Sequence, residues 1–379
     1  MSAKTLKRSG SGRKFGKKQR IIFLDYLRAF APILVITIHV ISRVQNYSDP
    51  FPDPCTPDFF WLAVLIRISR IAVPIFCMIS GALFLDPRRP FDMKKHFTKT
   101  IPRVVFVYLV WSLIYAAAVA AAESGTPHDR LVIYVRESLV GYWHLWYFKM
   151  LIAAYLLVPL LRKITEKRSL ARYTAGLIVF IVSMHTLTIL FETVVAVRGG
   201  GGLLGSLRTT VDASIVNIAG FMDLGFIAYF IIGYVLATEK FSKKWKWLIY
   251  GLGIAGLIMT IVFTVGRSRA LGTDFALEND GLGDLGIFLF ASAVFVWVRE
   301  VIGNRKKVGR TVSFMAKHSL GIYVIHALPI LLFSRFFEMP PYNMPSMFVI
   351  IPGSVLMIYG FSLLVSWLFS KIPLLNKVV

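Results

Sequence analysis

Long hydrophobic runs separated by short polar segments recur along the whole chain. A transmembrane helix needs about 20 predominantly apolar residues to cross the hydrocarbon core of a bilayer. Ten runs reach that length, so the pattern predicts an all-α polytopic membrane protein with about ten transmembrane helices. The predicted spans are residues 21–41, 60–85, 102–122, 143–161, 172–191, 215–237, 247–265, 284–301, 319–337 and 348–369.

The basic residues set the expected orientation of these spans. If the N-terminus is cytosolic, most of the 43 lysine and arginine residues fall on the inner side of the membrane, as the positive-inside rule requires. We therefore expect both termini to be cytoplasmic. The chain then divides into a disordered basic cytoplasmic tail (1–20), a single membrane domain (21–370) and a short cytoplasmic tail (371–379), with no further domain after the last helix.

Composition narrows the possible partners. The chain is 56% hydrophobic and has a mean hydropathy of +0.66, and only 17% of its residues are charged. In a soluble protein the net charge of +23 would indicate nucleic acid, but here the basic residues should meet anionic lipid head groups. We expect membrane lipids and no nucleic acid as partners, and the sequence indicates no oligomeric state. The two cysteines, Cys55 and Cys77, belong to no Cys/His cluster, so no metal site is predicted.

A polar stripe runs along the first predicted helix. Asp25 and Arg28 are three residues apart, and Arg28 and His39 are eleven apart, so all three share one helix face. Charges at membrane depth are costly and usually face a protein interior or an aqueous cavity. The stripe predicts that this face lines a cavity or a partner helix. The alternative is a structural Asp25–Arg28 pair with an interfacial histidine.

The second predicted helix holds two more arginines, Arg67 and Arg70, spaced R-x-x-R. Guanidinium groups in a membrane need anions or carbonyl oxygens nearby. The alternative is snorkelling to the outer head groups, which suits Arg67 better than the deeper Arg70. Pro74, in the same run, predicts a bent helix.

The fourth run opens with GYWHLWYFKML. Trp143, Trp146 and Tyr147 fit an aromatic belt at the outer membrane interface. That interpretation explains His144 only in part, and it hardly explains Lys149. We therefore regard His144, Trp146 and Lys149 as candidates for an acceptor site.

Two other regions hold candidate residues. In the ninth run His326 lies mid-membrane with Tyr323 three residues before it, and both are acceptor-site candidates, although a lone buried histidine is more often structural. The inner loop KKHFTKTIPR is mostly ordinary positive-inside charge. Its Lys99 and Arg103 could also bind an anionic cofactor.

This set of groups fits acyl transfer. Histidine is the usual general base at neutral pH, and arginine is suited to phosphates through its fixed fork of donors. An acyl-coenzyme A could keep its phosphates at the cytosolic bases while its pantetheine arm carries the thioester outward. These side chains alone distinguish an acyltransferase only weakly from an ion transporter.

The motifs resemble the membrane acyltransferase type 3 family. Its first-helix pattern R-x10-H matches Arg28 and His39, within an LDYLRAFA opening that is also similar. Arg67-x-x-Arg70 with VPIFCMISGALFL, HLWYF, and SLGIYVIH resemble three more of its motifs. The matches stand in the expected order and extend over about residues 20 to 370.

The resemblance implies an enzyme that moves an acetyl or other acyl group from cytosolic acyl-CoA to a sugar hydroxyl of a surface glycan or lipid-linked saccharide. Acetyl-CoA would be the donor substrate, with no metal. His39 would be the catalytic base, Asp25 would fix Arg28, and Arg28, Arg67 and Arg70 would hold the donor or the oxyanion. The chain looks most like the surface-polysaccharide O-acetyltransferase branch, which implies a multi-pass protein of the plasma membrane.

Two other functions use the same buried charges. A transporter of an organic anion or acyl donor would relay protons through His39 and His326 and leave its substrate unaltered. A non-catalytic partner in glycan synthesis would need the charges only for folding. Product formation from acyl-CoA separates the enzyme from both.

Overall fold

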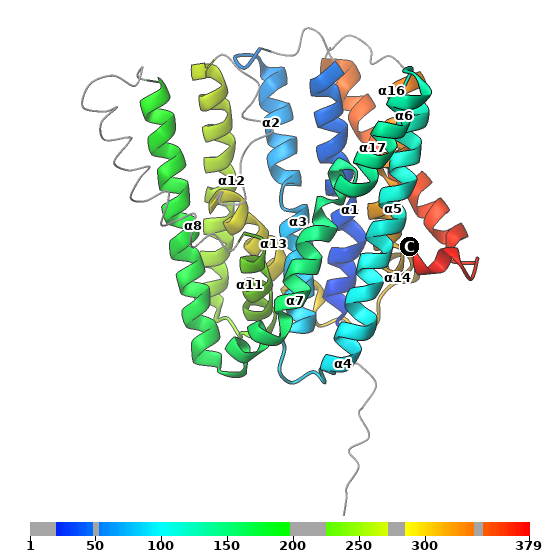
Figure 1. Ribbon diagram of the computed structural model, residues 1–379. Helices are drawn as coiled ribbons and strands as arrows, with labels where there is room; N and C mark the ends of the chain where they lie inside the picture. Colours follow the sequence, from blue (N-terminus) through cyan, green and yellow to red (C-terminus); the bar gives the residue numbers. More distant parts are fainter. Residues whose placement is uncertain (1–19, 48–52, 198–224, 272–284, 337–343) are drawn as a thin grey trace, which may run out of the picture.

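The computed structural model describes residues 20–47, 53–197, 225–271, 285–336 and 344–379. Within these residues the chain forms helices and no strands, which confirms the all-α prediction (Figure 1). The helices are α1 (Ile22–Tyr47), α2 (Pro57–Ser69), α3 (Ala72–Phe84), α4 (Met93–Lys95), α5 (Ile101–Ala122), α6 (Pro127–Val140), α7 (Trp146–Glu166), α8 (Arg168–Val197), α11 (Ile227–Thr238), α12 (Lys243–Leu271), α13 (Leu285–Ile302), α14 (Arg310–Lys317), α15 (Ser319–Ile325), α16 (Ala327–Phe336) and α17 (Met344–Phe369), with short π- or 3₁₀-turns at His96–Thr100, Trp143–Leu145 and Leu375–Lys377.

The helices form a multi-pass membrane bundle. In the part of the chain that the structure describes, 8 helical segments are long and apolar enough to cross a bilayer, or 9 if the bent pair formed by Arg310–Lys317 and Ser319–Leu332 is one span. The predicted sixth span, 215–237, contains α11, which has 12 residues, and residues 215–224 lie outside the described part. Length and composition therefore confirm a multi-pass helical protein and do not reach the predicted count of ten.

Prolines mark where two spans break. The second span is interrupted between α2 and α3, and Pro74 is the third residue of α3. The ninth span is interrupted between α15 and α16, and Pro329 is likewise the third residue of α16. Proline is tolerated in a first helical turn because the N–H groups there have no intrahelical partner. A new helix starts at Ala72, so the second span is interrupted close to Pro74, while Pro57–Phe84 still forms one span. The bend predicted from Pro74 stays a prediction.

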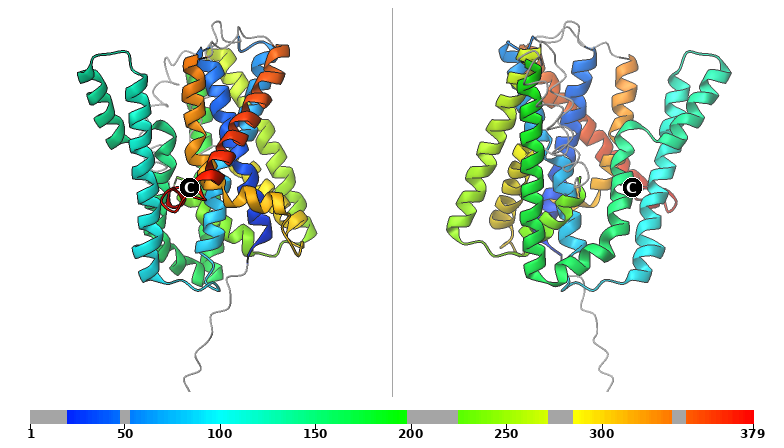
Figure 2. Two further views of the ribbon diagram at one scale, coloured as in Figure 1. Left: turned by 90° about the vertical axis from the view of Figure 1, so that its right-hand side faces the viewer. Right: turned by 60° about the vertical axis from the view of Figure 1, so that its left-hand side comes forward.

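A helical hairpin precedes the fourth predicted span. The chain leaves α5 and starts α6 with a capping box between Thr126 and Asp129, and α6 ends at Gly141, whose φ of 79° favours glycine. Figure 2 shows this α5–α6 hairpin leaning away from the other helices. The sequence pattern assigned residues 123–142 to a loop because α6 carries four charged residues.

Helices α3 and α11 pack with their backbones in close contact. A Cβ on Gly81 would lie 1.9 Å from the carbonyl oxygen of Phe230, and a Cβ on Gly233 would lie 2.3 Å from the Cα of Met78. Only glycine permits this approach at either position. The contact places α3, which follows the break at Arg70, firmly in the core.

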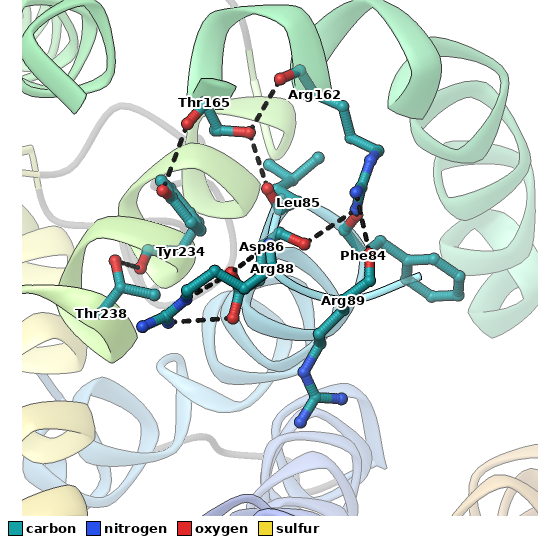
Figure 3. A network of polar contacts seen from close by, with 9 residues as sticks. All are labelled: Phe84, Leu85, Asp86, Arg88, Arg89, Arg162, Thr165, Tyr234 and Thr238. Carbon is teal, nitrogen blue, oxygen red and sulfur yellow. Dashed lines mark hydrogen bonds and ion pairs between the residues drawn. The ribbon is translucent and has the colours of Figure 1, made fainter. Parts of the chain in front are cut away.

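Side chains of α7 fix the segment that follows α3 (Figure 3). The guanidinium of Arg162 donates to the carbonyl oxygens of Phe84 (2.6 Å), Asp86 (3.1 Å) and Arg89 (3.1 Å). The hydroxyl of Thr165 donates to the Leu85 carbonyl at 2.6 Å. The last carbonyls of a helix have no intrahelical partner, so these bonds cap α3 and tie it to α7.

An acidic residue just after α11 anchors the same end of the bundle. Arg168 and Arg172 of α8 both donate to the carboxylate of Glu239, with shortest distances of 2.5 and 2.8 Å. The hydrogen bonds from Arg168 and then Arg172 lower the pKa of Glu239 to about 2. The same end carries α4, the start of α8 and residues 85–92 and 239–242, all of which hold lysines or arginines, and we call it the basic end (Figure 1).

Candidate active site

Three histidines from distant parts of the chain lie side by side within the bundle. The rings of His39 and His326 are nearly parallel, with their centroids 5.3 Å apart. The rings of His326 and His144 are nearly perpendicular, with centroids 5.2 Å apart. His144 and His326 are both 0% exposed, and His39 is partly exposed. We call these residues the histidine cluster.

Interrupted helices carry two of the three histidines. His144 lies in the 3₁₀-turn between α6 and α7, and His326 occupies the single position between α15 and α16. His39 comes from the continuous helix α1. Non-helical backbone at membrane depth is tolerated only where protein buries it or where it lines a cavity. The two breaks therefore bring polar backbone as well as imidazoles into one buried region.

Hydrogen bonds from tyrosines fix both breaks. The hydroxyl of Tyr323 donates to the carbonyl oxygen of His144 at 2.7 Å. The hydroxyl of Tyr115, on α5, donates to the carbonyl oxygen of Val324 at 2.8 Å. The Tyr115 ring also packs edge-on against the ring of His144, with centroids 4.8 Å apart. The sequence pattern did not single out Tyr115, since a tyrosine in an apolar helix looks like an ordinary core residue.

The polar stripe of α1 is present, and its two ends have different surroundings. Arg28 lies 3.8 Å from the buried carboxylate of Asp25, which also pairs with Arg20. Arg20 in turn donates to the hydroxyl of Ser313 at 2.9 Å, so the pair is linked to α14. His39, nearer the other end of α1, packs edge-on against Trp143 with ring centroids 4.4 Å apart.

A row of tyrosines connects the two ends of the stripe. Arg28 interacts electrostatically with Tyr155 and Tyr147 of α7. The ring of Tyr147 lies 5.1 Å from that of Tyr323, and the ring of Tyr323 lies 5.6 Å from that of His326. A series of contacts between buried tyrosines therefore links Arg28 to the histidine cluster.

The two arginines of the second span are not placed as the snorkelling alternative requires. Arg67 is 0% exposed, whereas Arg70 is partly exposed and forms the C-cap of α2. Arg70 also acts electrostatically on His39. The interpretation of Arg67 as a snorkelling residue is wrong, because α2 is buried along the face that carries it.

The aromatic residues around His144 divide between the core and the surface. Tyr147 is buried in the core, so the belt interpretation is wrong for this residue. Trp143 packs on His39 but is exposed, and Trp146 is exposed and lies against Phe226. Lys149 donates to the carbonyl oxygen of Val140 at 3.0 Å, which caps the end of α6. The structure brings His144 into the histidine cluster, while the described contacts of Trp146 and Lys149 lie elsewhere.

Lys99 and Arg103 lie at the basic end. Both are exposed, Lys99 in the π-turn His96–Thr100 and Arg103 in the first turn of α5. No described contact links them to the histidine cluster.

A buried histidine of the same segment has a structural role. Pro159 lacks a backbone N–H, so the carbonyl of Tyr155, four residues earlier, loses its helical hydrogen bond. His96 replaces that bond, since its Nε2 lies 2.9 Å from the Tyr155 carbonyl oxygen. The rings of Phe84, Phe91 and Tyr155 surround it.

No group of three or more His, Cys, Asp or Glu residues in the described chain could hold a metal ion.

The comparisons with known proteins bear on this arrangement. The membrane acyltransferase type 3 family, described as "Acyltransferase domain", matches residues 21–371, nearly the whole chain. The chain belongs to this family. Acyltransferase 3 proteins are membrane acyltransferases, so the histidine cluster, with Arg70 acting on His39, is the candidate catalytic centre.

One curated relative and the solved structures add little to the family assignment. An amino-acid racemase from Enterococcus faecalis is 25% identical over 170 residues, which cover 42% of this acyltransferase 3 chain and 23% of that protein. Because the match spans less than a quarter of the relative's length, its named activity says nothing of the present site. No solved structure matches.

Proposed function

We propose that the protein transfers an acetyl group from cytosolic acetyl-CoA to a hydroxyl group of a cell-surface glycan or lipid-linked saccharide, with His39 as the general base. One observation carries the proposal. His39 lies partly exposed beside two buried imidazoles, with Arg70 close enough to act on it electrostatically, in a chain of the acyltransferase 3 family.

The proposed reaction moves one proton and exchanges one bond. His39 accepts the proton of the acceptor hydroxyl as its oxygen attacks the thioester carbonyl, and a C–O bond forms. The negative charge that develops on the carbonyl oxygen is stabilised by the cation of Arg70 and by neighbouring donors. The C–S bond then breaks, and the protonated His39 returns its proton to the departing thiolate of coenzyme A.

The donor is proposed to enter from the basic end. Excess lysine and arginine mark the cytosolic side of a membrane protein, so we assign the basic end to the cytosol of a plasma-membrane protein. Lys99 and Arg103 are the proposed phosphate ligands there, and Arg28 is held by Asp25 further along the path. The row of tyrosines from Arg28 to His326 is the proposed course of the pantetheine arm.

The acceptor is proposed to meet the thioester at the histidine cluster, from the side opposite the basic end. His39 lies in the half of α1 further from the basic end, and Trp143, against which it packs, is exposed. Aromatic faces commonly pack against sugar rings through their apolar C–H surfaces, so Trp143 is a suitable wall for a saccharide.

The test is transfer of radiolabelled acetyl from acetyl-CoA to extractable glycan or lipid-linked saccharide. Membranes that contain the protein are compared with membranes from the same cells without it. Label in saccharide only when the protein is present supports the proposal. Label that crosses the membrane on unaltered acetyl-CoA contradicts it and indicates the transporter.

A further inference from the structure

The buried nitrogens beside His39 differ in what they can bind. The Nδ1 atom of His326 lies 2.6 Å from the carbonyl oxygen of Tyr323. A carbonyl oxygen only accepts, so Nδ1 carries the proton in this hydrogen bond. The Nε2 atom of a neutral His326 is then an acceptor, and it has no hydrogen-bond partner among the described residues.

His144 has more unmet hydrogen-bonding capacity than His326. Neither of its ring nitrogens has a hydrogen-bond partner in the described chain, and the side chain is 0% exposed. The Val324 carbonyl lies close enough to act on the ring, but it forms no hydrogen bond of good geometry with either nitrogen. A neutral imidazole carries one N–H whichever tautomer forms, so His144 always has a donor to offer.

An unpaired buried polar group costs about 1–3 kcal/mol. Buried polar groups in folded proteins are rarely left unpaired, so each exception calls for an explanation such as a catalytic role. The ring of His144 is surrounded by aromatic rings, namely those of Tyr115, Tyr142, Trp143 and Tyr323. These rings fix the orientation of the imidazole without forming hydrogen bonds to its nitrogens. Both nitrogens therefore remain available to bind a ligand.

The hydrogen-bonding groups of the acyl donor determine which histidine can bind it. A thioester carbonyl has lone pairs and no proton, so it needs a donor. Of the two fully buried imidazoles beside His39, neutral His326 offers only a lone pair at Nε2, whereas His144 offers an N–H. We propose, on the basis of the acyl-transfer function above, that His144 is a further catalytic residue whose N–H binds the carbonyl oxygen of the acyl donor and the oxyanion formed from it.

The substitution His144→Phe tests this role because it removes the donor and keeps an aromatic ring in the aromatic surroundings. His96→Phe is the matched control. His96 is also a buried histidine among aromatic rings, but its Nε2 is already bonded to the Tyr155 carbonyl, so His96→Phe removes a buried imidazole from outside the histidine cluster. His144→Gln keeps an N–H donor, and His144→Met is a second donor-free variant in case His144→Phe does not fold.

The measurement is the affinity of purified protein for two non-reactive coenzyme A thioethers. The S-(2-oxopropyl) thioether has a carbonyl that cannot be transferred, and the S-propyl thioether has none. One net hydrogen bond predicts that wild type and His96→Phe favour the ketone by roughly threefold to tenfold. His144→Phe and His144→Met should bind both compounds equally, and His144→Gln should keep part of the preference.

The outcomes separate this inference from the proposed function. An unchanged preference for the ketone in folded His144→Phe or His144→Met would overturn the role of His144 and leave the acyl-CoA donor standing. Failure of wild type to bind either compound would overturn the donor itself, and the role of His144 with it. With a saccharide acceptor in hand, His144→Phe should also lower kcat by about 10²- to 10³-fold, as loss of an oxyanion donor does.

Discussion

The imidazole rings of His39 and His326 lie nearly parallel with centroids 5.3 Å apart, although one belongs to α1 and the other to the break between α15 and α16. The contact joins an R-x10-H motif at one end of the chain to a YVIH motif near the other. Both motifs therefore serve one buried site, and substitutions in either should affect the same chemical step.

Removal of the cation beside His39 should slow the reaction. Arg70 acts electrostatically on His39, and a fixed cation near a developing oxyanion lowers the barrier. We expect Arg70→Met to reduce the rate of acetyl transfer by about 10²-fold and Arg70→Lys, which keeps the charge, to reduce it less. Arg269→Met is the control, since Arg269 is exposed and donates to the Pro54 carbonyl. Equal rates for Arg70→Met and wild type would remove Arg70 from the mechanism.

His96 and Pro159 should be energetically coupled through one carbonyl. His96→Phe leaves the Tyr155 carbonyl without its hydrogen bond, which costs about 1–3 kcal/mol for a buried group. Pro159→Ala restores a backbone N–H to the same carbonyl, so the cost of His96→Phe should be smaller in that background. Apparent melting temperatures of the two single variants and the double variant measure the coupling. Strictly additive effects would show that His96 stabilises α7 in another way.

The close contact between α3 and α11 should not accept a methyl group. A Cβ at position 81 would meet the Phe230 backbone, and rigid backbone cannot move aside as a flexible side chain can. Gly81→Ala should destabilise the protein by about 1–3 kcal/mol or more. Gly251→Ala is the matched control, because nothing lies within 4 Å of its Cβ in the middle of α12. Similar melting temperatures for both variants would contradict the packing described.

The Glu239 cluster predicts a loss of stability in acid. A carboxyl group whose pKa is lower in the folded protein contributes stability above its ordinary pKa of 4.5, and this contribution disappears as the pH falls toward about 2. Glu239→Gln should therefore melt below wild type at pH 7, and the difference should shrink between pH 5 and pH 3. A constant difference across that range would mean that ionised Glu239 adds nothing to stability. The effect should be small, because both arginines are exposed to solvent.

Periodicity and spacing were sufficient to predict much of the fold. The apolar runs located the helices because bilayer thickness fixes their length. Pro74 indicated an irregularity in the second span, and the helix is interrupted just before it. The Asp25–Arg28 contact followed from their separation of three residues and is present at 3.8 Å. These features depend on the spacing of residues along one helix, and that spacing can be measured in the sequence.

The site depends on packing between helices, which spacing along one helix does not determine. The helix α6 was missed because its charges resemble those of a loop, so the inward position of His144 could not be foreseen. The tautomer of His326 depends on the Tyr323 carbonyl, and the burial of Arg67 depends on its neighbours around α2. Their position in apolar runs singled out His144 and His326, but only the structure places them beside His39.

The central claim is that His39 is the base in acyl transfer, and one comparison tests it most directly. Detergent-purified wild type, His39→Ala and His318→Ala are given radiolabelled acetyl-CoA and the saccharide acceptor, and each must elute as a single folded species. His318 is the control, a buried histidine whose Nδ1 contacts the hydroxyl of Ser366 at 3.0 Å. We predict transfer by wild type and His318→Ala and a loss of at least about 10²-fold in His39→Ala. Transfer by folded His39→Ala at the wild-type rate would contradict the account.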